Sequence, residues 1–284
     1  MCGSRRVQPR FPAAPELKRC RECGVVFRAG QVGAEDLRRT YDKDYYLKAW
    51  PGSLGQFFSE FDPERHHKTR FLVRQLAELS RLCGGPGRIL DVGCANGVFP
   101  WLAQKAGWQA EGLEVSPFAA EWGRKQFGVT IHEVDLANLP PGPAYDAITF
   151  WDTIEHLPDP AGALRAAFAR LRPGGYLAAL TPDIDSLVNS LVHAAHRLAP
   201  RRTRPLLGKL YHQDHLSFFN PGSLAQALLA AGFTVHWMES YDEDPHDTET
   251  EGATRFALHL VGLAAGIMQR RHELLVYAQR PGGK

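Results

Sequence analysis

The segment RILDVGCANG, residues 88–97, constrains the fold of this chain more than any other part of the sequence. An apolar strand is predicted to end near Asp91, and a loop containing Gly93 and Gly97 then leads into a helix. Glycine allows such a loop to turn tightly and to approach a ligand closely. In an open parallel sheet, ligands bind beyond the carboxyl ends of the strands. The segment therefore predicts an α/β fold with a ligand site at this loop.

Short apolar strands and amphipathic helices alternate after this segment. The predicted order is strand 88–92, helix 98–106, strand 109–115, helix 117–127, strand 129–134, strand 146–151, helix 160–171, strand 176–181, helix 221–231, strand 233–239 and strand 273–279. Such alternation is typical of a mostly parallel sheet with helices on both faces. An amphipathic helix is also expected over 60–82, and an irregular segment over 201–213.

The predicted site is rich in acidic residues, which narrows the class of ligand. Glu114 ends the second strand, where a carboxylate can accept hydrogen bonds from both hydroxyls of a ribose. Asp135 follows the third strand and can accept from an adenine amino group, while the backbone N–H of Leu136 faces a ring nitrogen. Carboxylates repel phosphates, and the loop lacks the G-x-G-x-x-G spacing of dinucleotide binding. A nucleoside without phosphates is therefore favoured over a nicotinamide dinucleotide.

The chain resembles the class I S-adenosylmethionine-dependent methyltransferases, and within them the quinone-biosynthesis-like branch. The resemblance rests on DVGCANG, GLEVSP, EVD, YDAITFWDTIEHLPDP, LRPGGYL and HLSFFNPGSLAQALLAAGF, in this order, and covers about residues 60–281. It implies a Rossmann-like, seven-stranded, mostly parallel sheet with an antiparallel last strand. It also implies S-adenosylmethionine as the cofactor.

By this resemblance, Asp91, Gly93 and Gly97 line the methionine and ribose side of the cofactor, Glu114 holds the ribose and Asp135 the adenine. The remaining residues expected in contact with the cofactor are Cys94, Ala95, Val115, Leu136 and Trp151. Ala95 departs from the family, which usually has glycine there. Cys94 is interpreted as a packing residue rather than a nucleophile.

Three residues are candidates for catalysis. Asp152 directly follows the fourth strand, His156 follows in WDTIEHLPDP, and His215 lies in DHLSFF. Methyl transfer to a hydroxyl gains from a general base with a pKa near 7, and histidine is the usual choice. A turn hydrogen bond is the alternative role for His156, and a structural bond to backbone is the alternative for His215.

The N-terminal cysteines suggest part of a metal site. Cys20 and Cys23 form a C-x-x-C pair, which is half of a zinc knuckle, whereas structural zinc takes four ligands. Met1 to Ser4 resembles the end of a second knuckle whose first cysteine would lie upstream. We therefore expect a metal set of Cys2, Cys20 and Cys23 that binds zinc weakly or not at all. The alternative is two surface thiols in an ordered loop.

The domain organisation follows from these motifs. We expect a partial zinc-knuckle-like segment at 1–30, a connector at 31–59 and a methyltransferase domain at 60–284, with an acceptor-side insertion at 183–220. The insertion is basic, which favours an anionic or amphipathic acceptor. The apolar helix expected at 253–269 suits core or lid packing, with peripheral membrane or dimer contact as the alternative.

Composition sets the remaining limits. The 33 Lys and Arg nearly balance the 31 Asp and Glu, which gives no general case for nucleic acid. No apolar run is long enough to span a membrane, no signal peptide is visible and five cysteines do not form a secreted framework. We expect a cytoplasmic methyltransferase that acts at oxygen on a small molecule or glycoconjugate. The alternative is a binding or scaffold protein that keeps the fold with little or no activity.

Overall fold

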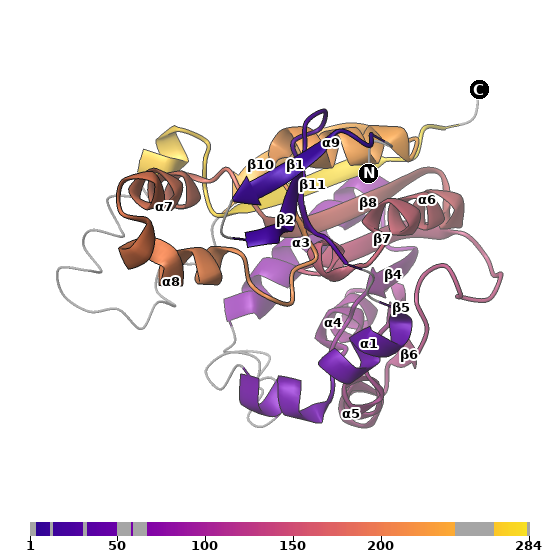
Figure 1. Cartoon of the computed structure of the whole chain (residues 1–284). Helices are drawn as coiled ribbons and strands as arrows, with labels where there is room; N and C mark the ends of the chain where they lie inside the picture. The colour runs from indigo at the N-terminus through magenta and orange to yellow at the C-terminus, as the bar shows by residue number, and fades with distance from the viewer. Residues whose placement is uncertain are drawn as a thin grey trace.

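The computed structural model describes residues 4–11, 14–30, 33–49, 58, 67–241 and 264–282. A large mixed sheet with helices on both sides forms its centre, and a small sheet lies at one end (Figure 1).

The large sheet has seven strands in the order β10-β11-β8-β7-β4-β5-β6. Their bounds are β4 Arg88–Val92, β5 Gln109–Leu113, β6 Thr130–His132, β7 Tyr145–Trp151, β8 Leu171–Pro182, β10 Thr234–Tyr241 and β11 Glu273–Gln279. The five strands from β8 to β6 pair in parallel, and β11 pairs antiparallel with both β8 and β10. The expected Rossmann-like sheet with an antiparallel last strand is thereby confirmed.

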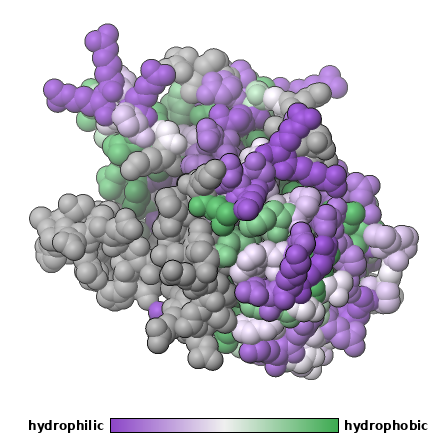
Figure 2. Space-filling view, turned by 90° about the horizontal axis from the view of Figure 1, so that it is seen from below, coloured by the Kyte–Doolittle hydropathy of each residue, from purple (hydrophilic) through white to green (hydrophobic). Residues whose placement is uncertain are grey.

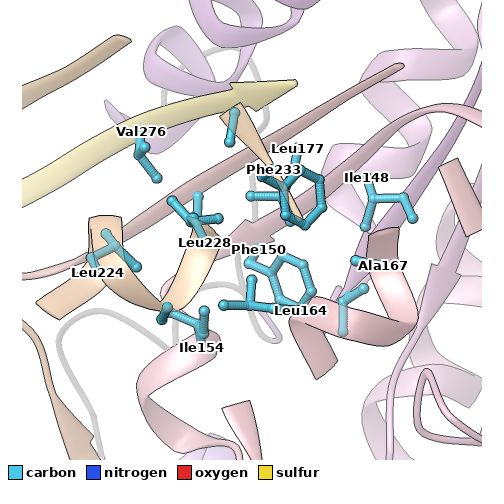
Figure 3. Close-up of a cluster of buried hydrophobic side chains, with 14 of the residues drawn as sticks. Ile148, Phe150, Ile154, Leu164, Ala167, Leu177, Leu224, Leu228, Phe233 and Val276 are labelled. Atoms are coloured by element: carbon cyan, nitrogen blue, oxygen red, sulfur yellow. The ribbon is translucent and has the colours of Figure 1, made fainter. Parts of the chain in front are cut away.

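Helices cover both faces of this sheet. Their bounds are α3 His67–Cys83, α4 Val98–Lys105, α5 Pro117–Phe127, α6 Pro160–Arg170 and α9 Pro221–Ala230. Successive residues of a strand point to opposite faces, so Ile148 and Phe150 of β7 pack towards α6 and α9 (Figure 3), whereas Ala147 packs towards α3 and α4. The side of the sheet that faces α6 and α9 includes the fully buried Leu164 and Leu228.

A second sheet of four strands joins the N-terminal segment to the acceptor-side insertion. It has the order β1-β2-β3-β9, with β1 Val7–Phe11, β2 Ala14–Cys20, β3 Val26–Arg28 and β9 Ser217–Phe218. Its strands all pair antiparallel. The sequence did not predict this sheet, because its pairing joins residues that are nearly 200 positions apart in the chain.

The connector contributes two short helical pieces, α1 Ala34–Thr40 and η1 Tyr45–Ala49. Tyr46 of η1 is buried and lies against Phe58 and Phe118, with ring centroids 4.8 and 6.3 Å away. The connector is thereby fixed on α5, next to the loops that follow β4 and β5.

The insertion differs from the sequence prediction in one part. It forms α7 Leu187–Leu198 as expected, but 201–213 is not irregular, because Pro200–Leu210 forms helix α8. Leu207 and Leu210 pack beside a buried cluster that contains Tyr211 and Phe218. This packing outweighs the backbone hydrogen bond that Pro205 removes from the helix interior.

The expected helix at 253–269 falls mostly outside the described residues, which show helix only at 264–267. Of the helices that the structure describes, none combines the length and apolar character needed to cross a bilayer. Hydrophilic residues occupy much of the described surface in the view from below, with hydrophobic patches between them (Figure 2).

Candidate functional site

The loop from β4 to α4 has the tight form that its sequence predicted. Gly93 has φ +73°, and a Cβ atom there would lie 2.5 Å from Cγ2 of Thr153. Gly97 has φ +77° and precedes α4, where a Cβ atom would meet Val129 and Ile131. Both positions adopt a backbone conformation that favours glycine. The loop backbone is therefore open to close approach along the carboxyl edge of the sheet.

Glu114 holds this loop in place. One of its carboxylate oxygens accepts a hydrogen bond from the backbone N–H of Ala95 at 3.0 Å, and the other accepts from that of Ser116 at 2.8 Å. Val115 follows directly and is partly buried. A carboxylate has about four lone-pair sites, so Glu114 retains acceptor capacity for hydroxyl groups of a ligand.

Asp91 lies beside Glu114 in the same buried edge. Its carboxylate accepts a hydrogen bond from Oγ1 of Thr149 at 2.7 Å. Burial raises the pKa of Asp91 to about 8, opposed by the Thr149 hydrogen bond and reinforced by the charge of Glu114. Burial likewise raises the pKa of Glu114 to about 7, against its backbone hydrogen bonds. Two buried acids in contact with a loop backbone are poised for a ligand that brings its own donors or positive charge.

Cys94 and Ala95 occupy the turn itself. Cys94 is buried against Gly112, and burial raises the pKa of its thiol well above the ordinary value. Its surroundings therefore suit packing rather than nucleophilic attack. Ala95 has φ +46°, a left-handed conformation that costs a non-glycine residue energy.

Asp135 and Leu136 follow β6 but differ in exposure. Leu136 is buried, whereas Asp135 is exposed, and its carboxylate accepts hydrogen bonds from the backbone and side-chain amides of Asn138 at 2.8 and 3.0 Å. Asp135 therefore closes a turn in this ligand-free structure.

Trp151 ends β7 at the same edge. Its indole ring lies edge-on to Phe71 and Phe99, with ring centroids 5.5 Å away in each case. Its buried Nε1 has no hydrogen-bond partner among the described residues. An unpaired buried donor is costly, so this N–H favours a ligand that supplies an acceptor. Together with the glycine loop and the lone pairs of Glu114, it fits a nucleoside-bearing cofactor.

The three catalytic candidates lie beyond the end of β7. Asp152 has φ +48°, and its carboxylate accepts a hydrogen bond from Nζ of Lys68 at 3.1 Å. His156 belongs to the short helix η2 Ile154–His156. Its ring lies perpendicular to that of His215, with centroids 4.6 Å apart. The structure thus brings the two histidines together, although 58 positions separate Asp214 from His156 in the chain.

The hydrogen bonds of His156 fix its tautomer. Nδ1 lies 3.0 Å from the backbone oxygen of Asp214, which can only accept, and 2.8 Å from the hydroxyl of Tyr41. Nδ1 therefore carries a proton, and Nε2 has the lone pair. The turn bond considered for this residue is thus present. Burial lowers the pKa of His156, and it lowers that of His215 to about 3, helped by the charge of His156. Both rings are neutral at pH 7.

Two residues beside the histidines were missed by sequence reasoning. Glu155 is buried, accepts a hydrogen bond from Oγ1 of Thr181 at 2.9 Å, and has a pKa raised by burial and by the charge of Asp152. Tyr41 comes from the connector, and burial raises its pKa well above the ordinary value. The motif that contains His156 could have drawn attention to Glu155, but no local signal marked Tyr41.

The N-terminal cysteines lie in the small sheet. Cys20 ends β2, Cys23 lies in the next turn, and neither forms a disulfide. Both side chains are buried, with 4% and 7% of their surface exposed, so the alternative of two surface thiols is wrong. Cys2 lies outside the described residues. The three-thiol metal set stays a prediction.

Comparison with protein families gives a match over most of the large sheet. A family described as "Methyltransferase domain" matches residues 65–236. The ubiquinone biosynthesis O-methyltransferase of Bordetella bronchiseptica is 30% identical over 201 residues, which are 65% of this chain and 79% of that protein. The protein of the same name from Ralstonia nicotianae is 25% identical over 222 residues, 70% of this chain and 88% of that one.

Solved structures share the fold. An S-adenosylmethionine-dependent methyltransferase from Mesorhizobium loti has a TM-score of 0.52 at 21% identity, over 77% of this chain and 100% of that one. The cyclase SpnF has a TM-score of 0.58 at 19% identity, over 90% of this chain and 100% of that one. At such identities the likeness concerns architecture alone.

Proposed function

The chain belongs to the methyltransferase-domain family, and from this premise we propose that it transfers a methyl group from S-adenosylmethionine to a hydroxyl of a small molecule. The relatives named for ubiquinone biosynthesis favour a hydroxylated quinone precursor as the acceptor. A sugar or a glycolipid head group is the other class that the basic insertion would suit.

In this proposal the carboxyl edge of the sheet binds the cofactor. Gly93 and Gly97 let the loop backbone approach the methionine and ribose, and Asp91 lies behind it. Glu114 accepts hydrogen bonds from the ribose hydroxyls, and Asp135 turns towards the adenine amino group. The cofactor supplies an activated methyl group on a sulfonium sulfur.

The remaining cofactor contacts come from residues that surround these groups. Cys94, Ala95, Val115 and Leu136 form the walls, and the face of Trp151 lies beside the sulfonium, where an aromatic ring is favourable for a cation.

The residues beyond β7 act on the acceptor. In-line attack by the hydroxyl oxygen forms an O–C bond as the S–C bond breaks, so holding the oxygen in line is the main task. His156 and His215 are neutral at pH 7 and can lower the cost of removing the hydroxyl proton. Asp152, paired with Lys68, closes the site on the cofactor side.

One observation carries the proposal: Glu114 holds the cofactor loop at the same sheet edge from which β7 leads directly to Asp152 and His156. The test is transfer of a labelled methyl group from S-adenosylmethionine to catechols with and without a polyprenyl chain. Nucleotide sugars serve as the second panel. Labelled catechol ether is expected. Cofactor binding without transfer to any acceptor would favour the scaffold alternative.

A cytoplasmic location and a weak zinc site at Cys2, Cys20 and Cys23 are proposed on the sequence argument alone. Metal analysis of the purified chain tests the second: stoichiometric zinc held by these thiols would contradict the incomplete set.

A further inference from the structure

We propose that Glu155, His156 and His215 bind a divalent transition-metal ion on the acceptor side of the site. The inference rests on the proposed O-methyl transfer and gives the acceptor hydroxyl a direct binding partner.

The three side chains converge on one point. One ligand atom from each residue lies within 4.8 Å of those of the other two. Ligands at about 2.0–2.2 Å from a metal ion lie roughly 3–4.5 Å from each other, so small side-chain rotations suffice to close the set. The structure places no other group of three such residues together in the part of the chain that it describes.

Each of the three residues also has a ligand atom to spare. His156 donates its Nδ1–H to the backbone oxygen of Asp214, which leaves Nε2 unprotonated. Metal-bound histidines almost always donate their other N–H to a carbonyl or carboxylate in this way. No described residue hydrogen-bonds to either ring nitrogen of His215, and only one oxygen of Glu155 accepts from Thr181.

The donor set indicates the class of ion. Two imidazoles and one carboxylate suit Zn²⁺, Fe²⁺, Mn²⁺ or Co²⁺ rather than Mg²⁺ or Ca²⁺, which prefer oxygen ligands. Three protein ligands leave coordination positions open, as in catalytic rather than structural sites. A hydroxyl, or two neighbouring hydroxyls of one acceptor, can take those positions.

A bound ion would change how the acceptor is activated. Coordination lowers the pKa of a bound hydroxyl, so its O–H bond ionises and the proton leaves to solvent. The oxygen then attacks the methyl carbon, the S–C bond breaks, and its electron pair stays on sulfur to give S-adenosylhomocysteine. The two imidazoles serve as ligands in this state, not as bases.

The test uses Co²⁺ on the full chain after dialysis against a chelator. Bound Co²⁺ is read from its visible absorption, and thiolate ligation by Cys20 and Cys23 is recognised by separate charge-transfer bands. We expect one Co²⁺ per chain without thiolate bands. His215→Ala and Glu155→Gln each weaken binding by at least about tenfold. His212→Ala is the matched control, because that ring lies 5.7 Å from His215 but outside the set, and it binds Co²⁺ as the unchanged chain does.

Folded protein that binds no Co²⁺ overturns the inference, as does unchanged binding by folded His215→Ala. Methyl transfer at full rate in chelator-treated protein also overturns it, while the proposed function stands. Failure of the chain to bind S-adenosylhomocysteine would instead remove the proposed function, whatever the result with Co²⁺.

Discussion

The backbone N–H of Ala95 donates a hydrogen bond to the carboxylate of Glu114 at 3.0 Å. This bond joins the loop after β4 to the end of β5, so the acid expected to hold the ribose also sets the shape of the loop expected to hold the methionine. A single substitution at Glu114 should therefore disturb both parts of the cofactor site.

Glu114→Gln should weaken binding of S-adenosylhomocysteine by about tenfold or more, because hydrogen bonds to a charged group are worth roughly 1.5–3 kcal/mol. The measurement is the rise in melting temperature with ligand concentration. Glu121→Gln is the matched control, since Glu121 is exposed on α5 and pairs only with Lys125 on that helix. Equal ligand-induced shifts in the two variants would show that Glu114 does not bind the cofactor.

Ala95→Val should lower the free energy of unfolding by about 1–3 kcal/mol, because a β-branched residue is strained at φ +46°. Ala95→Gly should stay within roughly 1 kcal/mol of the original chain, since relief of strain offsets the greater freedom of the unfolded glycine. Urea unfolding measures both. A valine variant as stable as the original would mean that the loop is not held in this conformation.

Ligand-free protein should lose stability as the pH rises from about 5 to 8. Burial raises the pKa of Asp91 to about 8, whereas an unfolded aspartate ionises near ~3.9. The folded state therefore binds the proton more tightly, and its stabilisation is complete below about pH 4 and lost through pH 8.

Asp91→Asn should remove part of this slope, by at least about 1 kcal/mol over the range, while Glu114 retains another part. Urea unfolding at several pH values measures it. Parallel pH profiles for the two proteins would contradict the buried, proton-binding role of Asp91.

Tyr41→Phe should lower the rate of methyl transfer by up to about tenfold while cofactor affinity changes less than twofold. It removes the hydroxyl that lies 2.8 Å from Nδ1 of His156, and such a bond is worth about 0.5–1.5 kcal/mol. Tyr176→Phe, in β8 and paired in register with Ala147 of β7, is the control and should leave the rate unchanged. A normal rate in Tyr41→Phe would assign Tyr41 to packing alone.

The sheet could be predicted because its signals are local. Each strand is a short apolar run followed by a helix, and Gly93 and Gly97 mark the one loop where the backbone turns left-handed. The residues at the strand ends then follow from the topology. The helix α8 could not be predicted, because Pro205 favours a break and the packing of Leu207 and Leu210 comes from elsewhere in the chain.

The acceptor side depends on long-range contacts that no local pattern encodes. Tyr41 meets His156 across 115 positions, and β3 pairs with β9 although the first lies in the N-terminal segment and the second in the insertion. Sequence reasoning chose His156 and His215 separately, whereas only the fold brings their rings together with Glu155.

Calorimetric titration of the purified chain with S-adenosylhomocysteine tests the central claim most directly. The account predicts one binding site per chain, with heat that disappears when the loop is blocked by Gly93→Val, where a Cβ atom would collide with Thr153. Absence of binding in the folded, unaltered chain would contradict a cofactor site at this edge of the sheet.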